Sequence, residues 1–292
     1  MDIEKNGGLL IWNAPISEED AVFGTEDTHV AGLMDAGKGE YAQQGPGIVA
    51  KSYADDIYLR VYIKDNDGNY VYSPLTVYSV RTYCESRLEK SSNAKLKSTC
   101  ANLLHFGAAA QTYFGYNTDD LANANIVDTW PQPEWDASLI DALEEPVTNI
   151  VGTGTVSDNG KTLSLTGALF VNFYFGLDAS VGEPTTAELL FWDEVDGQLT
   201  LDNVTYKRDL IATGKEYAAQ SDMFAAREFG KTLFVCAHFV DEDGNDHYSD
   251  VTAYSPEEYA AGRLLKSSNA NLKALVKAMV TYGEAARTYF SK

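Results

Sequence analysis

The chain contains one segment twice, far apart along the sequence. Residues 87–97 read RLEKSSNAKLK and residues 263–273 read RLLKSSNANLK, with nine of eleven positions identical at an offset of 176. At the same offset, further segments match without a gap: Tyr41 with Tyr217, Asp67-Gly68-Asn69 with Asp243-Gly244-Asn245, and Thr112-Tyr113-Phe114 with Thr288-Tyr289-Phe290. Solenoid and propeller repeats have periods of about 20 to 50 residues, so this period is too long for them. We therefore predict two copies of one domain-sized module.

The bulk composition limits the possible partners. The 292 residues fit two ordinary domains, and a hydrophobic content of 45% is typical of globular proteins. The net charge of −21 repels nucleic acid, whose binding depends on lysine and arginine side chains that neutralise phosphates. No apolar run reaches the roughly 18 residues needed to cross a bilayer, so we predict no membrane insertion. An acidic surface suits an uncharged partner, such as a neutral glycan, without requiring one.

The sequence carries no motif for a metal, a cofactor or a catalytic centre. The cysteines Cys84, Cys100 and Cys236 lack metal-ligand spacing, and we expect free, mostly buried thiols, with a Cys84–Cys100 bridge left open. The four histidines do not cluster. Serine-nucleophile, phosphate-loop and zinc-protease motifs are absent, and a pair of carboxylates among 43 acidic residues would arise by chance. We therefore predict a protein that is not an enzyme and needs no cofactor.

The second copy shows strand patterns ahead of helical ones. Runs from Leu163 to Phe175 and from Glu188 to Trp192 are rich in β-branched and aromatic residues, which favour strands. Two further runs, Lys231 to Val240 and Asp246 to Ser249, flank Asp243-Gly244, which is the pattern of a β-hairpin. The first copy repeats this hairpin. Its first strand alternates apolar and other residues from Ile57 to Ile63, so we expect one face of the sheet to be buried.

The hairpin turn of the first copy also resembles the start of a calcium loop, Asp65-x-Asp67-Gly68-Asn69. A calcium loop of this kind needs an acid at its twelfth position, which here is Thr76. We therefore favour a hairpin turn and keep calcium binding as the alternative.

Helical segments follow the strands in both copies. Ser255-Pro256 is a strong helix start, because serine caps the first turn and proline favours its first position. Ser267 to Asn269 should end this helix and cap the next one. The last helix of each copy contains a central glycine, Gly107 or Gly283, which costs about 1 kcal/mol relative to alanine. Because both copies accept that cost, we expect another element to pack closely there.

We therefore predict an α+β fold of two repeated lobes, each a β-sheet or small β-sandwich followed by a helical hairpin. Lobe 1 spans residues 1–120, a linker containing Trp and Pro spans 121–148 with a short helix at 137–143, and lobe 2 spans 149–292. The strand pattern that opens the second copy has no equivalent before Trp12, and no signal peptide is present. We expect a first copy that begins part-way through the module, in a fragment of a larger multi-domain protein.

Tryptophan is the main signal for a binding function. After a shift of four residues from the offset of 176, Trp12 and Trp192 occupy the same strand position in the two copies. Trp130 and Trp135 lie in the linker. An indole ring can cover the apolar face of a sugar, while the sugar hydroxyls bond to nearby polar groups. All four are therefore candidate carbohydrate-binding residues. The alternative is structural: Trp12 and Trp192 fill the cores, and Trp130 and Trp135 attach the linker to a lobe.

Two helical segments, residues 107–122 and 272–290, and the strand run from Val171 to Tyr174 resemble a module that recurs in large surface proteins of gut Firmicutes. The match covers nearly the whole chain. The two-lobed arrangement resembles the starch-binding domain of the starch adherence system proteins of the bacterial amylosome. That resemblance implies a secreted, cell-surface protein that binds starch, amylose and maltooligosaccharides without cleaving them.

The sequence thus predicts non-catalytic binding of an α-1,4-glucan, held by aromatic stacking in a groove shared by two lobes. The alternative is a protein-interaction or spacer module of a cell-surface assembly, in which the aromatic side chains are core residues. A third hypothesis, a glycoside hydrolase, needs two carboxylates roughly 5 to 10 Å apart in a cleft.

Overall fold

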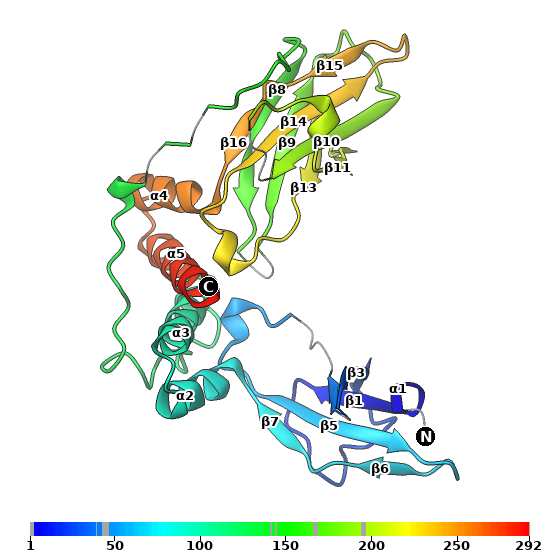
Figure 1. Cartoon of the computed structure of the whole chain (residues 1–292), viewed down its shortest axis with the longest axis vertical. Coiled ribbons are helices and arrows are strands. Elements are labelled where there is room, and N and C mark those ends of the chain that lie inside the picture. The colour runs from blue at the N-terminus through cyan, green and yellow to red at the C-terminus, as the bar shows by residue number, and fades with distance from the viewer. Residues whose placement is uncertain are drawn as a thin grey trace. The chain divides into compact units, whose positions relative to one another are not determined.

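The computed structural model describes residues 3–38, 40–42, 47–140, 142–143, 145–165, 169–193 and 197–291. The chain divides into two compact units, Met1–Pro131 and Gln132–Lys292. Each unit contains antiparallel sheets followed by a pair of longer helices (Figure 1), so the predicted α+β class is confirmed. The expected boundaries at residues 120 and 148 stay predictions, and residues 121–131 fall in the first unit.

The first unit is built on a five-stranded antiparallel sheet. Its elements are α1 (Ile3–Asn6), β1 (Gly7–Trp12), β2 (His29–Gly32), β3 (Met34–Gly37), β4 (Glu40–Ala42), the 3-10 helix η1 (Ala50–Ser52), β5 (Ile57–Lys64), β6 (Tyr70–Tyr72), β7 (Thr76–Tyr78), α2 (Val80–Lys90) and α3 (Ala94–Phe114). The strand order is β2-β1-β5-β6, and β7 also pairs with β5. A separate two-stranded sheet joins β3 and β4.

The second unit contains a sheet with the same connections and a second sheet of four strands. Its elements are η2 (Ala137–Leu139), β8 (Val156–Leu163), β9 (Val171–Leu177), β10 (Thr186–Asp193), η3 (Leu201–Asn203), β11 (Tyr206–Asp209), β12 (Ile211–Ala212), β13 (Tyr217–Gln220), η4 (Ala226–Glu228), β14 (Leu233–Val240), β15 (Asp246–Tyr248), β16 (Thr252–Tyr254), α4 (Pro256–Lys266) and α5 (Ala270–Phe290). The five-stranded sheet has the order β11-β10-β14-β15, with β16 pairing β14, and the other sheet has the order β12-β13-β9-β8.

Both predicted hairpins are present, and their turns use the acidic side chains internally. In the β5–β6 turn, Asp65 Oδ1 accepts hydrogen bonds from the backbone N–H groups of Asp67 and Asn69, at 2.9 and 2.8 Å. Asp241 accepts the matching bond from Asn245 at 2.8 Å. The hairpin prediction is confirmed. Among the described residues, no group of three or more acidic, histidine or cysteine side chains is placed to hold a metal ion.

The predicted helix boundaries are also confirmed. Ser255 caps α4 by accepting a hydrogen bond from Glu258 N, and Asn269 caps α5 by accepting one from Leu272 N. The short helix expected at 137–143 is the 3-10 helix η2; part of that span lies outside the described residues. None of the helices in the described ranges combines the length and the apolar character needed to cross a membrane.

One strand begins earlier than its pattern predicts. The sequence pattern predicts that the opening strand of the second copy begins at Leu163, whereas β8 begins at Val156 and contains Asp158-Asn159-Gly160. This polar triplet has the composition of a turn. In the structure it stays within the strand, and the register of β8 with β9 shifts between Asp158 and Gly160. Gly160 has φ 104° there. A glycine in the left-handed region absorbs the extra residue as a β-bulge, so the strand continues through the triplet.

Each unit has its own apolar cores. In the second unit the four-stranded sheet packs on the five-stranded one, where the Phe173 and Phe191 rings lie 6.0 Å apart. In the first unit a core between α2 and α3 includes both cysteine thiols, Cys84 at 0% and Cys100 at 3% exposure. Cys236 is equally buried, and all three are free thiols. A hydrogen bond with Cys100 raises the pKa of Cys84, so the two thiols are neighbours.

The central glycines accept an aromatic ring, as expected. A Cβ atom at Gly107 would lie 2.7 Å from the Tyr53 ring and 3.1 Å from the Cβ atom of Ala122. At Gly283 it would lie 2.6 Å from the Phe229 ring. The segment that carries the 3-10 helix η1 or η4 thus packs directly on the long helix of its unit. Only glycine leaves room for that contact.

Gly107→Ala and Gly283→Ala should each destabilise the protein by roughly 1 to 3 kcal/mol, because the added methyl group overlaps a packed ring. Gly262→Ala in α4 is the matched control, since nothing lies within 4 Å of the added methyl group there. That substitution should stabilise the helix by up to about 1 kcal/mol. Urea unfolding measures all three free energies. The same effect at all three glycines would contradict the packing explanation.

Candidate functional site

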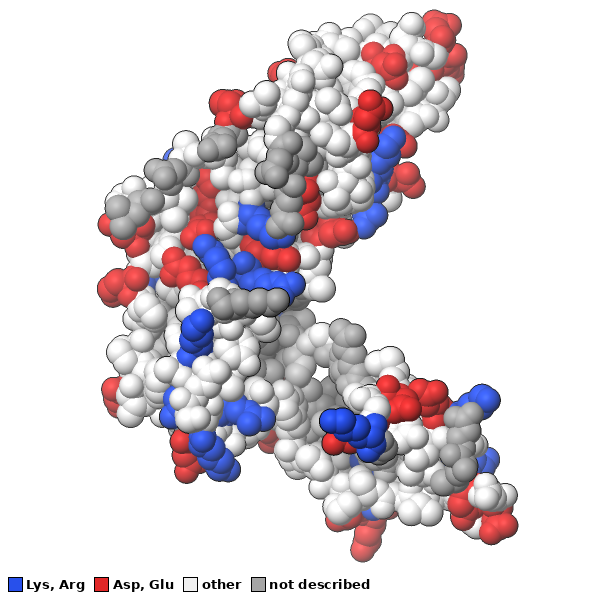
Figure 2. Space-filling model, in the orientation of Figure 1, with Lys and Arg blue, Asp and Glu red and all other residues white. Residues whose placement is uncertain are grey.

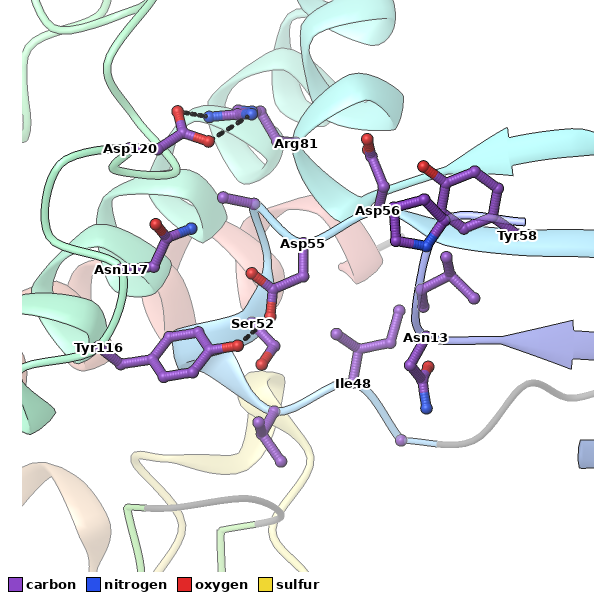
Figure 3. Close-up of a pocket in the computed structure, with 15 residues that line it drawn as sticks. Asn13, Ile48, Ser52, Asp55, Asp56, Tyr58, Arg81, Tyr116, Asn117 and Asp120 are labelled. Atoms are coloured by element: carbon purple, nitrogen blue, oxygen red, sulfur yellow. Dashed lines mark hydrogen bonds and ion pairs between the residues drawn. The ribbon is translucent and has the colours of Figure 1, made fainter. Parts of the chain in front are cut away.

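A polar pocket in the first unit is the candidate functional site (Figure 3). Its volume of about 720 Å³ falls within the range of about 300 to 1,000 Å³ that is typical of small-molecule sites. Four segments meet around it: the end of β1, residues 47–58, the start of α2 and the loop that follows α3. The lining residues are Asn13, Pro15, Gly47, Ile48, Val49, Ser52, Ala54, Asp55, Asp56, Ile57, Tyr58, Arg81, Tyr116, Asn117 and Asp120.

The 47–58 segment is positioned by Tyr53. The Tyr53 ring packs on α3 at Gly107, and its carbonyl oxygen accepts a hydrogen bond from the backbone N–H of Arg81 at 2.9 Å. Ala54, the next residue, is 4% exposed. The chain is therefore fixed to both helices immediately before Asp55 and Asp56. These two acidic residues follow without a flexible spacer and lie at the pocket wall (Figure 3).

The loop after α3 is fixed by one buried amide. Gln111 is 0% exposed, and its Nε2 donates to the carbonyl oxygens of Asn117 and Asp120, at 3.1 and 3.0 Å. Its Oε1 accepts from the backbone N–H of Ala122 at 2.7 Å. Gly115 ends the helix with φ 62°, in the left-handed conformation that favours glycine. A loop held by three hydrogen bonds to one buried side chain presents its own side chains in one arrangement.

Tyr116 and Asp55 form the first polar pair of the pocket. The Tyr116 hydroxyl donates to Asp55 Oδ2 at 2.7 Å (Figure 3). This hydrogen bond is the main reason that the pKa of Tyr116 is raised above its usual value, whereas a hydrogen bond with Ser52 acts in the opposite direction. The Lys51 ammonium lies 5.0 Å from the centroid of the Tyr116 ring, within reach of a cation–π interaction. The ring is still 37% exposed.

Arg81 and Asp120 form the second polar pair. Two N–H groups of the Arg81 guanidinium donate to the two carboxylate oxygens of Asp120, at 2.5 and 3.0 Å. This bidentate contact lowers the pKa of Asp120, so the carboxylate stays ionised at neutral pH. The same contact neutralises the charge of Arg81.

The pocket is therefore acidic and rich in hydrogen-bonding groups. Its described lining residues include three carboxylates, at Asp55, Asp56 and Asp120. They include one cation, Arg81, and this cation is already paired with Asp120. Acidic side chains are also widespread on the face of the molecule in Figure 2, in keeping with the net charge of −21. Such a field disfavours an anionic ligand. It suits a neutral ligand whose hydroxyl groups donate to carboxylates.

The second unit has a smaller pocket at corresponding positions, with a volume of about 190 Å³. At the offset of 176, Lys231 of this pocket takes the place of Asp55. Glu257, which takes the place of Arg81, is not among the described residues that line the smaller pocket. Glu257 pairs with Arg287 at 3.3 Å. The pocket residues of the first unit were not predicted from the sequence, although this reversal of charge between matched positions was the available signal. Aligned copies that keep their core but reverse surface charges differ in what those surfaces contact.

Two of the four candidate tryptophans lie in cores. Trp192 is 0% exposed, and its Nε1 donates to the carbonyl oxygen of Thr200 at 2.9 Å. Trp12 is 3% exposed, and its Nε1 donates to Thr28 Oγ1 at 2.9 Å. Neither indole offers a free face to a sugar in this structure. Their burial favours the structural alternative, because a fully packed ring cannot also stack on a ligand.

The two linker tryptophans are half-buried and lie in different units. Trp130 packs against the α2–α3 core of the first unit, and its carbonyl oxygen lies 2.7 Å from His105 Nε2. Trp135 belongs to the second unit and forms a hydrogen bond with Glu284. Neither lines the pocket of the first unit. Both contacts fit the expectation that these residues attach the linker, and a binding role for them stays a prediction.

His105 should make the first unit sensitive to acid. It is 5% exposed, and burial is the main cause that lowers its pKa below about 6.5. Asn123 Nδ2 lies 3.0 Å from His105 Nδ1 and donates to it, so a proton on Nδ1 would face another donor.

A lowered folded-state pKa means that stability is present above the ordinary pKa and is lost as pH falls through the folded-state value. We expect the melting temperature to fall between pH 7 and pH 5, and to fall less in His105→Gln. An equal fall in both proteins, measured by circular dichroism, would exclude His105 as the cause.

A comparison with protein-family models and with curated proteins finds no match for this chain.

Proposed function

We propose that the chain is a non-catalytic carbohydrate-binding protein, and that the pocket of the first unit holds part of a neutral glucan chain. The observation that carries the proposal is a pocket rich in carboxylates and amides, with a paired cation and an exposed tyrosine ring at its wall. Sugar hydroxyls donate and accept hydrogen bonds, so they can satisfy carboxylates and amides at once. The Tyr116 ring offers apolar contact for the C–H groups of a sugar.

Binding without cleavage fits the ionisation of Asp120. A glycoside hydrolase needs a carboxylic acid that stays protonated near neutral pH, which requires a raised pKa. Arg81 lowers the pKa of Asp120 instead. Asp55 Oδ2 accepts a hydrogen bond from the Tyr116 hydroxyl. These contacts favour a site that accepts hydrogen bonds from a ligand over one that donates protons to it.

The choice of α-1,4-glucan, meaning starch, amylose or maltooligosaccharides, rests on the resemblance to starch adherence system proteins. The same resemblance supports a secreted protein at a bacterial cell surface, within a larger multi-domain chain. We further propose that the chain consists of two repeated lobes, each a β-sheet or small β-sandwich followed by a helical hairpin. The strand order β2-β1-β5-β6 of the first unit and β11-β10-β14-β15 of the second support this reading, as do the matched glycine contacts.

A protein-interaction or spacer role is the second candidate function. An aromatic cluster lies on the first unit, where the Phe23 and Tyr70 rings stack at a centroid distance of 4.9 Å. These rings are 41% and 37% exposed. Exposed aromatic clusters are enriched at protein interfaces. If this role is the principal one, the protein should migrate through a starch-containing native gel without retardation.

Tyr116→Ala should weaken the binding of maltoheptaose by at least about tenfold, or about 1.4 kcal/mol. The truncation removes the ring contact and the hydroxyl that orients Asp55. Tyr83→Ala is the matched control: this tyrosine is 40% exposed and lies under Arg87 at 4.9 Å, much as Tyr116 lies under Lys51, but it is outside the pocket. Isothermal titration calorimetry of the whole chain measures both affinities.

Cello-oligosaccharides of equal length are the ligand control for the same titrations. Binding of maltoheptaose should change little with salt, because a neutral ligand forms no ion pair for salt to screen. Undiminished binding in Tyr116→Ala would move the glucan site away from this pocket. No binding of any glucan to the unmodified chain would refute the proposed function itself.

A further inference from the structure

The two units cover the same sheet face to different extents. In β14 the alternate side chains from Leu233 to Phe239 are at most 4% exposed. Their counterparts in β5, the alternate side chains from Ile57 to Ile63, are only half-buried. Their alternation in the sequence predicts a buried face. The first unit therefore leaves partly open an apolar face that the second unit closes.

In the second unit, β9 and β13 close this face. The Phe173 ring of β9 lies 6.0 Å from that of Phe191, and the Tyr217 ring of β13 lies 5.0 Å from that of Phe239. The inward side chains of β9, at Val171, Phe173 and Phe175, are at most 1% exposed. The cover is therefore an amphipathic strand with alternating apolar and aromatic residues, paired with β8 on its other side.

The first unit has the strand to which such a cover would add. At the offset of 176, Tyr41 in β4 corresponds to Tyr217 in β13. Tyr217 pairs with Phe175 across the β13–β9 ladder, whereas within the described part of the chain β4 pairs with β3 alone. Tyr41 is 37% exposed. An unpaired edge strand offers backbone donors and acceptors to another strand.

The open face extends to β6. Val71 pairs with Ile63, so both side chains lie on the same face of the sheet, and Val71 is 60% exposed. Its counterpart in the second unit is His247, whose side chain is 15% exposed. His247 Nδ1 lies 2.9 Å from Thr155 Oγ1, in the residue just before β8. In the second unit the β8–β9 hairpin thus reaches the position at which the first unit exposes a valine.

We propose that this face of the first unit, from the free edge of β4 to Val71, binds a β-hairpin supplied by another polypeptide. One strand of the hairpin adds antiparallel to β4, as β9 does to β13, and the other lies toward β6 as β8 lies toward β15. Main-chain hydrogen bonds give such an interface its affinity, and alternate side chains give it specificity. The hairpin carries apolar or aromatic side chains at every second position on the face turned to the sheet. This interaction is independent of glucan binding.

A β-hairpin is the occupant that fits this face, because the second unit of the same chain covers the matching face with one. A lone helix would cover the apolar side chains but would leave the β4 edge unpaired, whereas a hairpin satisfies both needs. Burial of apolar surface provides the driving force. A covered edge is also protected from uncontrolled strand pairing.

A peptide with the sequence of residues 153–178, closed by a cysteine at each end, is the probe. It should bind the whole chain with one-to-one stoichiometry in isothermal titration calorimetry. Val71→Lys should weaken binding by at least about tenfold, because it places a charge in an apolar contact. Val77→Lys is the matched control: Val77 is 52% exposed on the neighbouring strand β7, but it pairs with Tyr58 and so lies on the opposite face.

Val61→Lys places a charge at the centre of the face and should likewise weaken binding of the peptide. A thermal melt of this variant shows whether the protein remains folded. A peptide with serine at the positions of Phe173 and Phe175 should fail to bind. Equal binding to the Val71→Lys and Val77→Lys variants would overturn the proposal, as would the absence of any binding of the closed peptide. A dimer of the whole chain that Val71→Lys abolishes would also overturn it, because a second copy would then occupy the face.

Discussion

The contact of an aromatic ring with a helical glycine is the interaction on which each unit depends. Tyr53 packs on Gly107 in the first unit, and Phe229 packs on Gly283 in the second. In both cases the ring belongs to the segment that leads from the 3-10 helix into the central strand of the sheet. The contact therefore joins sheet and helices at one point. An added methyl group has no room there, which explains why a helix-weakening residue occupies the middle of each long helix.

The candidate pocket follows from this contact in the first unit. Fixing Tyr53 also fixes the next few residues, and Asp55 and Asp56 are among them. On the other side, Gln111 of the same helix holds the loop that carries Tyr116 and Asp120. Two separate segments of the chain are thus held against one helix. The polar groups between them are preorganised, so a ligand would not have to order them on binding.

Local chemistry allowed much of the fold to be predicted from the sequence. The repeat, the Ser255 and Asn269 caps, the two hairpins and the close packing at Gly107 all depend on residues near one another in the chain or matched between copies. The β8 strand was placed too late, because its bulge at Gly160 makes a strand look like a turn. Whether a face is buried depends on distant strands. For that reason Trp12 and Trp192 could not be assigned to core or surface from their pattern.

The pocket could not be predicted for a similar reason. Its side chains come from four separate segments, and no spacing rule connects Asp55 with Tyr116 or Arg81 with Asp120. Only the reversed charges at matched positions, such as Asp55 against Lys231, indicated that the two copies differ there. The half-burial of the β5 side chains could not be predicted either. A regular apolar alternation indicates that one face of a strand should be buried, but it does not indicate which element covers that face.

Hydrogen–deuterium exchange of the whole chain, with and without saturating maltoheptaose, tests the central claim most directly. If the pocket of the first unit holds the glucan, the ligand should protect backbone amides in residues 47–58 and 115–122. The corresponding residues of the second unit, 223–234, should exchange at an unchanged rate. Protection confined to segments outside this pocket, or no protection at any amide, would contradict the claim.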